Sequence, residues 1–228
     1  MTGVISPRTD ILPRAQQQLW PQLRAAAAMG FVLYGGTAVA LRLGHRVSVD
    51  FDFFSDAALD CDAIRVALPF TAQALVLQDE RNTFTVQVAP GDQPGAYVKV
   101  SFFGAIGFGR VGEPDITRDG VLQIASPEDL MATKLKVLLQ RAEAKDYRDI
   151  AALIAAGVGL SNGLAAARVL FGTAFQPSEC LKALVYFEDG DLSTLTKAEK
   201  TSLIAAASAV RELPDIAILN PRLAVPAA

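Results

Sequence analysis

Residues 31–54 read FVLYGGTAVALRLGHRVSVDFDFF, and this stretch decides how the rest of the chain is interpreted. An apolar run typical of a short strand ends at Gly35-Gly36, and a run with helical character follows. A second strand-like run then carries Asp50 and Asp52. The elements follow one another as strand, Gly-Gly turn, helix and acidic strand. This order narrows the possible functions much more than any one of its parts does.

The acidic strand has two chemically different faces. Successive side chains of a strand point to opposite sides, so Asp50 and Asp52 share one face, roughly 7 Å apart along the strand. Val49, Phe51 and Phe53 share the other face, which we expect to enter a core. Two hard oxygen ligands beside a turn that exposes backbone N–H groups suit Mg²⁺ and a triphosphate. Taken singly, Asp-x-Asp is also typical of a solvated strand end and Gly-Gly of an ordinary turn; their combination predicts nucleotidyl transfer.

Two blocks of residues resemble a known family. The first comprises Gly35-Gly36-Thr37, Leu41, Gly44-His45-Arg46, Ser48 and Asp50-Phe51-Asp52-Phe53. The second comprises Lys134-Leu135, Leu138-Leu139, Arg141 and Lys145-Asp146-Tyr147-Arg148-Asp149-Ile150. Together they resemble the AbiEii/AbiGii-type nucleotidyltransferases, toxin-like members of the DNA polymerase β-like superfamily.

The resemblance implies an enzyme that uses an NTP and Mg²⁺ or Mn²⁺. It assigns metal binding to Asp50 and Asp52, and catalysis to these two with Lys134 and Asp149. It also implies that the NMP goes to an acceptor hydroxyl, such as that of an RNA or a tRNA end, and that a cognate antitoxin protein is a partner.

Nucleotide binding is expected from several groups near the glycine turn and from one lysine. The residues with this expected role are Gly35, Gly36, Thr37, Ser48 and Lys134. Arg46 could approach a phosphate or pair with Asp52, and the sequence does not choose between these roles.

The periodicity of the sequence changes near residue 126, from a mixed strand and helix pattern to a helical one. We therefore predict an α/β (α+β) fold: a minimal nucleotidyltransferase mixed β-sheet with flanking helices in residues 1–125, followed by an all-helical half in residues 126–228 that contributes Lys134 and Asp149 to the site. Hydrophobic periodicity predicts further strands at 74–78, 83–88, 96–103 and 121–124. It predicts helices at 14–29 and 60–68, from 127 onward, and at 145–156, 161–171, 177–187 and 196–210. The last 15 residues, with three prolines, resemble a docked or frayed tail.

The second block carries several charges whose roles are open. If one unbroken helix covers residues 134–149, Lys134, Arg141, Lys145 and Arg148 form a basic stripe. This stripe is either a phosphate-binding face or an ordinary solvated face. Asp149 would lie at its edge, away from the apolar face, whereas Asp146 would flank the core. We therefore prefer Asp149 as the site residue and keep Asp146 and Arg141 as possible ones.

One departure from related enzymes concerns a third carboxylate. Many polymerase β-like enzymes place one on a later strand, but the candidate strand at 96–103 offers Ser101. A hydroxyl is a poor Mg²⁺ ligand and a poor general base at neutral pH. This opens two alternatives to RNA modification: a non-catalytic nucleotide-binding regulatory domain, or a nucleotidyl modifier of a protein hydroxyl.

The amino-acid composition argues against several other classes of protein. The chain has 228 residues, 51% of them hydrophobic, and a formal net charge of −3, so nucleic-acid contacts would need a local basic patch. Two distant cysteines and one histidine do not form a zinc or iron–sulfur pattern. Arg8, Asp10 and Arg14 stand where a signal peptide needs an apolar run, and the most apolar stretch, residues 25–34, is too short to span a membrane. We therefore expect a cytoplasmic protein without membrane contacts.

Overall fold

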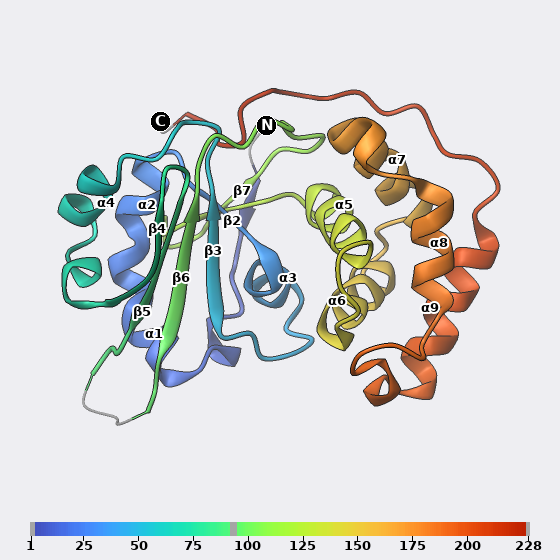
Figure 1. The fold of residues 1–228 in the computed structure, drawn as a ribbon, viewed down its shortest axis with the longest axis horizontal. Helices are drawn as coiled ribbons and strands as arrows, with labels where there is room; N and C mark the ends of the chain where they lie inside the picture. The colour runs from blue at the N-terminus through green and yellow to red at the C-terminus, as the bar shows by residue number, and fades with distance from the viewer. Residues whose placement is uncertain (1–2, 92–94, 227–228) are drawn as a thin grey trace. The chain divides into compact units, whose positions relative to one another are not determined.

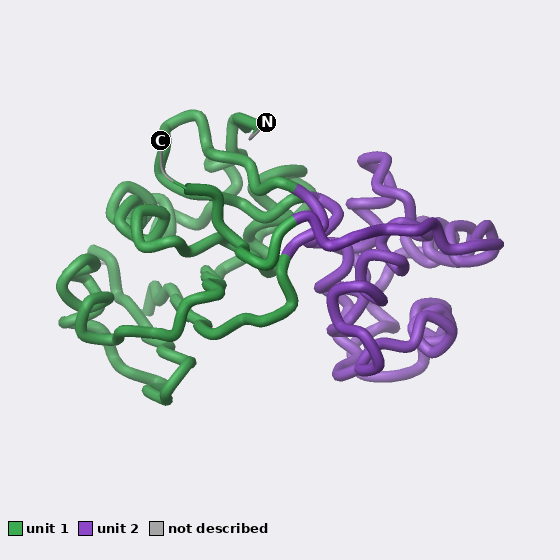
Figure 2. Tube along the Cα trace, turned by 90° about the horizontal axis from the view of Figure 1, so that it is seen from above, with its two compact units in different colours: residues 1–109, 113–126, 220–228 green, residues 110–112, 127–219 purple. Residues whose placement is uncertain are grey.

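A computed structural model of the chain describes residues 3–91 and 95–226, and the chain divides into two units (Figure 2). The first, here called the sheet unit, takes residues 1–109, 113–126 and 220–228. The second, the helical unit, takes residues 110–112 and 127–219.

The sheet unit contains one mixed sheet of eight strands within the described residues. Their order across the sheet is β1-β7-β8-β2-β3-β6-β5-β4. The strands are β1 Val4–Ile5, β2 Val32–Tyr34, β3 Asp50–Phe54, β4 Leu75–Glu80, β5 Thr83–Val88, β6 Val98–Phe103, β7 Asp115–Thr117 and β8 Gln123–Ile124. The acidic strand β3 lies in the middle, antiparallel to β2 and parallel to β6.

Among the residues that the structure describes, four α-helices lie against this sheet. They are α1 Arg14–Leu19, α2 Arg24–Ala28, α3 Gly35–Leu43 and α4 Cys61–Ala67. Figure 1 shows α1, α2 and α4 on one side of the sheet and α3 on the other. The helix expected over 14–29 is interrupted by the 3₁₀ turn Trp20–Leu23, because Pro21 cannot donate an interior helical hydrogen bond. Asp60 caps α4 as its N-cap position requires, accepting a hydrogen bond from the Ala63 amide at 2.9 Å.

An aromatic core lies between the sheet and the helices α1, α2 and α4. Phe51, Phe53 and Phe102 are fully buried, and the rings of Phe53 and Phe102 stack 5.3 Å apart. Trp20 meets Phe51 from the helical side at 6.4 Å between ring centroids. Since Phe51 and Phe53 alternate with the two aspartates, burying this face holds β3 in one register.

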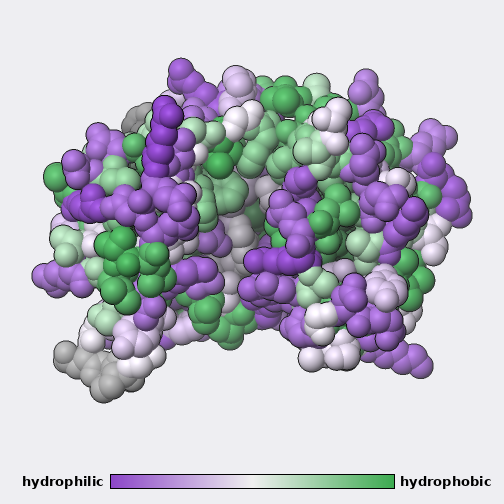
Figure 3. Space-filling model, in the orientation of Figure 1, coloured by the Kyte–Doolittle hydropathy of each residue, from purple (hydrophilic) through white to green (hydrophobic). Residues whose placement is uncertain are grey.

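Strand β4 forms one edge of the sheet and exposes apolar side chains. Leu75, Val76 and Leu77 are 63%, 44% and 48% exposed. Figure 3 shows hydrophobic and hydrophilic side chains mixed over the face that it draws. A register shift between Val76 and Gln78 and the charges of Asp79 and Glu80 are features that discourage pairing with a further strand.

The helical unit contains five α-helices within its described residues. They are α5 Pro127–Leu138, α6 Ala144–Ala155, α7 Leu160–Phe171, α8 Pro177–Val185 and α9 Lys197–Ala209. Helix α5 packs against α6, α7 and α8, while α9 packs against α6 and α8. The succession of a mixed sheet with flanking helices and a helical region confirms the predicted fold class.

Two short segments lie outside the sequence-based domain limits. Residues 110–112 belong to the helical unit, where the Val111 and Gly112 amides donate to the Asp129 carboxylate at 2.9 and 3.2 Å. The chain from residue 220 returns to the sheet unit, where Leu223 is fully buried. Gln123 and Val225 exchange two hydrogen bonds of 2.9 Å there. Within the expected tail, residues 223–225 are therefore docked on the sheet unit; residues 227–228 lie outside the described residues.

Candidate active site

The glycine turn of the sheet unit stands directly against one aspartate. Helix α3 begins at Gly35, immediately after β2, and Gly35 has φ = 72°, a left-handed conformation that favours glycine. A Cβ atom built on Gly35 would lie 2.5 Å from Asp52 Oδ2. Both the turn and the approach of the carboxylate therefore require glycine. The first amides of α3 lack helical acceptors and form a positive helix end suited to an anion.

Strand β3 presents the two carboxylates as the sequence predicts. Residues 50–54 alternate between partly exposed and buried, with Asp50 and Asp52 on the partly exposed face and Phe51 on the buried one. The Asp50 side chain is 34% exposed. Tyr34 pairs with Asp52 across β2 and β3, which places Asp52 next to the glycine turn. The expectation for Val49 is wrong: it precedes the strand and is 53% exposed.

Arg46 and Ser48 lie at the second glycine. A Cβ on Gly36 would collide with the Arg46 guanidinium and would lie 3.1 Å from Ser48 Oγ. The guanidinium also donates to the carbonyl of Val47 at 3.0 Å. A fixed positive group therefore adjoins the amides at the start of α3, which suits a phosphate.

The Thr37 hydroxyl is turned into the protein. Thr37 is 1% exposed, and its Oγ1 lies 2.9 Å from Ser48 Oγ and donates to the backbone carbonyl of Asp50. These contacts tie the first turn of α3 to the start of β3. The hydroxyl thus holds the turn and the acidic strand together, while the Thr37 amide belongs to the helix end.

Strand β6 adds two side chains to the acidic face. Its parallel register pairs Asp50 with Lys99 and Asp52 with Ser101. Lys99 Nζ lies 3.4 Å from Asp50 Oδ2, and Ser101 is 2% exposed. Ser101 was singled out from the sequence, but Lys99 was not. The alternation of side chains along residues 96–103 places Lys99 and Ser101 on one face. The sequence does not predict which strand lies beside them.

Asp50 and Asp52 would have to bind a divalent cation together. Asp50 and Asp52 are hard oxygen ligands on one face, next to a turn whose amides can hold phosphate. Within the described residues, no group of three or more His, Cys, Asp or Glu side chains is placed to hold a metal ion. A cation held by Asp50 and Asp52 would take its remaining ligands from substrate and water.

The residues expected from the second block lie in the helical unit. Lys134 on α5 is 6% exposed, and its ammonium lies 2.7 Å from Asp146 Oδ1 and 2.6 Å from Asp149 Oδ2. Both aspartates come from α6 and are fully buried. Arg141 adds a contact from outside, with Nε 2.9 Å from Asp146 Oδ2. The expectation that Asp149 points away from the core and Asp146 alone flanks it is wrong, because both carboxylates surround the same buried ammonium.

The predicted basic stripe does not form, because the helix ends at Leu138 and a new one begins at Ala144. Lys145 pairs with Glu143 at 2.8 Å. Arg148 donates to the Thr194 carbonyl at 2.8 Å and so fastens α6 to the segment before α9. Arg141 and Lys145 therefore share Glu143, while Arg148 contacts Thr194, all within this unit.

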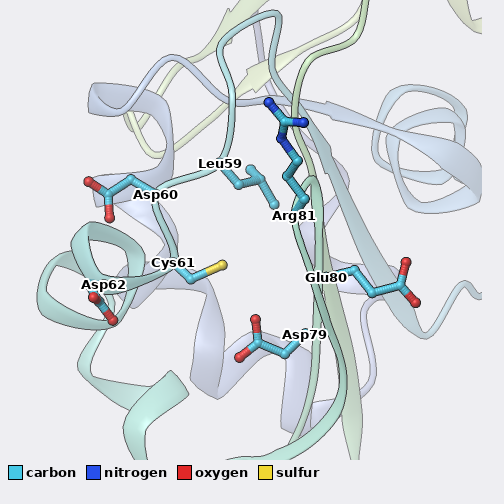
Figure 4. Close-up of a pocket in the computed structure, with 7 residues that line it drawn as sticks. All are labelled: Leu59, Asp60, Cys61, Asp62, Asp79, Glu80 and Arg81. Atoms are coloured by element: carbon cyan, nitrogen blue, oxygen red, sulfur yellow. The ribbon is translucent and has the colours of Figure 1, made fainter.

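A hollow of about 530 Å³ beside α4 is a poor candidate for nucleotide binding (Figure 4). It is lined by Leu59, Asp60, Cys61, Asp62, Asp79, Glu80 and Arg81. Cys61 and Asp79 point into it, whereas Asp62 and Glu80 point away. Burial and the nearby Asp79 raise the pKa of the Cys61 thiol, which keeps it protonated and weakly nucleophilic. The Asp79 carboxylate that points into the hollow and the excess of acidic over basic residues in its lining disfavour a triphosphate.

Comparison with known proteins gives the chain its family. The family model described as "Nucleotidyl transferase AbiEii toxin, Type IV TA system" matches residues 22–206. This range includes both blocks of residues singled out in the sequence. The chain belongs to this family of nucleotidyl transferase toxins of type IV toxin–antitoxin systems, and the resemblance is confirmed.

Two individual proteins are similar to the chain. The uncharacterized protein aq_aa25 of Aquifex aeolicus (strain VF5) is 30% identical over 122 residues, 53% of this chain and 55% of that protein. The chain thus spans about half the length of this curated relative. The solved structure of MenT4, nucleotidyltransferase toxin Rv2826c from Mycobacterium tuberculosis H37Rv, has a TM-score of 0.57 and 14% identity, covering 86% of this chain and 82% of that one. At this identity, the likeness supports the fold alone.

No helix in the described part of the chain combines the length and the apolar character that crossing a membrane needs.

Proposed function

We propose that this protein is a Mg²⁺- or Mn²⁺-dependent nucleotidyltransferase that moves an NMP from an NTP to an acceptor hydroxyl. The observation that carries the proposal is the approach of Asp52 to Gly35, with Asp50 on the same strand face. One small region thus combines two metal-binding carboxylates with the amides of a helix end.

The proposed transfer needs no reactant besides the NTP and the acceptor hydroxyl. The acceptor oxygen bonds to the α-phosphorus, the bond from this phosphorus to the bridging oxygen of the β-phosphate breaks, and pyrophosphate leaves with the electron pair. The hydroxyl proton passes to a site carboxylate or to water. A bound Mg²⁺ would neutralise triphosphate charge and polarise the α-phosphoryl group.

The site residues of the sheet unit have three proposed roles. The amides at Gly35 and Gly36 and the Arg46 guanidinium hold phosphate oxygens. Asp50 and Asp52 hold the cation. Ser48 and Thr37 position the turn against the acidic strand, as their contact of 2.9 Å supports.

In the helical unit, we propose Lys134 and Asp149 as residues that the reaction needs. The support is the family membership and the burial of an ammonium between two carboxylates, an arrangement that fixes the orientation of the lysine. Asp146 and Arg141 complete this cluster as positioning residues.

RNA, such as a tRNA end, is the proposed acceptor, a cognate antitoxin the proposed partner and the cytoplasm the proposed location. The toxin–antitoxin description of the family supports the antitoxin. The RNA acceptor follows from the resemblance in the sequence.

The proposal is tested by incubating the protein with each α-labelled ribonucleoside triphosphate, Mg²⁺ and either cellular RNA or cellular protein. We expect label in the RNA fraction, dependence on one preferred nucleotide, and loss of transfer in Asp52→Asn. Label in protein alone would replace RNA with a protein hydroxyl as acceptor.

A non-catalytic nucleotide-binding domain is the second candidate, because Ser101 stands opposite Asp52 where a third carboxylate would strengthen metal binding. Nucleotide binding without transfer to any acceptor would favour this candidate.

A further inference from the structure

The acidic face of the sheet carries a lysine that no part of the proposal has used. Lys99 is paired in register with Asp50 on the adjacent parallel strand, and its ammonium lies 3.4 Å from Asp50 Oδ2. It is the only lysine before Lys134 in the sequence. The Lys99 side chain is 44% exposed, so its tip can move while its stem stays on β6.

The position of Lys99 changes the charge of the site. Two metal ions that act together lie about 3.5–4 Å apart and are held by carboxylates around both. Here one ammonium stands beside the two carboxylates, the Arg46 guanidinium stands at the neighbouring Gly36, and Ser101 contributes no charge, so the site lacks the surplus negative charge that two divalent ions need. An ammonium beside Asp50 would also repel a second divalent cation from that carboxylate.

From this arrangement we propose that Lys99 takes the place of a second metal ion in a site that binds one divalent cation. The inference rests on the proposed function and specifies its substrate contacts. In the free protein Lys99 pairs with Asp50. When Asp50 and Asp52 hold a cation and an NTP is bound, the ammonium contacts an α-phosphate oxygen and stabilises the charge that develops there.

The chemistry of lysine suits this role. An ammonium is a compact charge with three donors that rotate freely, so it can leave a carboxylate for a phosphate oxygen without rearranging the backbone. No covalent bond to Lys99 is involved. The acceptor oxygen still forms its bond to the α-phosphorus while the bond from this phosphorus to pyrophosphate breaks.

Counting bound Mn²⁺ by electron paramagnetic resonance, with the metal alone as probe, tests the cation stoichiometry. We expect one Mn²⁺ per chain in the wild type and none at this site in Asp50→Asn. Lys99→Met should still bind one, several-fold more tightly, because the competing ammonium is gone. Two ions per wild-type chain, both lost in Asp50→Asn, would overturn the inference while leaving metal-dependent transfer intact.

Turnover tests the substrate contact. Lys99→Met should lower nucleotidyl transfer roughly 10- to 100-fold, the loss expected for one charge-assisted hydrogen bond, and Lys99→Arg should retain part of the activity. Lys182→Met, at a lysine that is 72% exposed on α8, is the matched control and should transfer at the wild-type rate. A wild-type rate in Lys99→Met would show that Lys99 only neutralises Asp50. Absence of transfer in the wild type would instead contradict the proposed function, and the Mn²⁺ count would still test Lys99.

Discussion

Lys134 Nζ lies 2.6 Å from Asp149 Oδ2, and the two side chains are 7% and 0% exposed. Asp146 contacts the same ammonium at 2.7 Å. The charge of Lys134 is thus compensated inside the helical unit, by carboxylates that have little access to water. Any role of this lysine in the reaction is therefore tied to the stability of α5 and α6.

Lys134→Met should destabilise the protein strongly. It leaves two buried carboxylates without their shared cation, and breaking a buried pair typically costs about 3–5 kcal/mol. Lys145→Met is the control, because Lys145 is half-exposed and pairs with Glu143 at the surface, so we expect a loss of less than about 1 kcal/mol. Urea unfolding of both variants measures the difference, and equal losses would contradict the compensation of Lys134 by the two aspartates.

Gly35→Ala should abolish nucleotide binding. The new Cβ would need a left-handed backbone and would meet Asp52 Oδ2, so the turn or the carboxylate must move. Gly30→Ala is the matched control: Gly30 has φ = 81°, but nothing lies within 4 Å of its Cβ position. Both variants should lose about 1–2 kcal/mol of stability from the left-handed backbone. Gly35→Ala should lose more because its Cβ meets Asp52, and it alone should lose affinity for an NTP in calorimetric titration. Full affinity in Gly35→Ala would exclude the turn from the site.

Local patterns predicted the core of the sheet unit well. The strand at 83–88 has the predicted bounds, and the alternation of Asp50 and Asp52 with Phe51 and Phe53 correctly gave the two faces of β3. These features depend on neighbours in sequence, so periodicity reveals them.

Features set by distant parts of the chain could not be predicted in this way. Residues 139–143 contain no glycine or proline, so the sequence favours a continuous helix there. The break arises from tertiary contacts, such as the Ala144 amide donating to Asp191 Oδ1 at 2.6 Å. Strands β1 and β7 were missed because each is very short and because the residues that they pair lie about half of the chain apart in the sequence. Lys99 was missed for the same reason, since only the pairing of β3 with β6 brings it to Asp50.

Gln16→Leu should stabilise the protein. Gln16 is 1% exposed, and neither its side-chain nitrogen nor its oxygen finds a hydrogen-bond partner among the residues described. Removing an unsatisfied buried amide should raise the free energy of unfolding by about 1–3 kcal/mol. Gln17→Leu is the control: the Gln17 amide donates to the Leu12 carbonyl at 2.8 Å, so its loss should not stabilise. A lower melting temperature in Gln16→Leu would contradict this account of the site.

Alkaline pH should weaken the helical unit through Cys180. Burial raises the pKa of this thiol from 9.0 to about 12, so the folded state keeps a proton that the unfolded state loses. Its contribution to stability is complete below pH 9 and is lost as the pH rises towards 12. Cys180→Ala should therefore show a shallower decline in the free energy of unfolding between pH 9 and 11 than the wild type. Identical slopes would mean that the thiol does not titrate with unfolding.

Asp50→Asn tests the central claim most directly, because the amide nearly matches the carboxylate in shape but is a much weaker metal ligand. The measurement is transfer of labelled NMP to RNA with Mg²⁺, alongside a thermal melt and Asp62→Asn as control, whose side chain is 96% exposed. We expect Asp50→Asn to fold but to transfer at least about 100-fold more slowly, since a lost metal ligand removes several kcal/mol of transition-state stabilisation. Wild-type transfer with unchanged Mg²⁺ dependence in Asp50→Asn would show that Asp50 is not a ligand and would contradict the proposed active site.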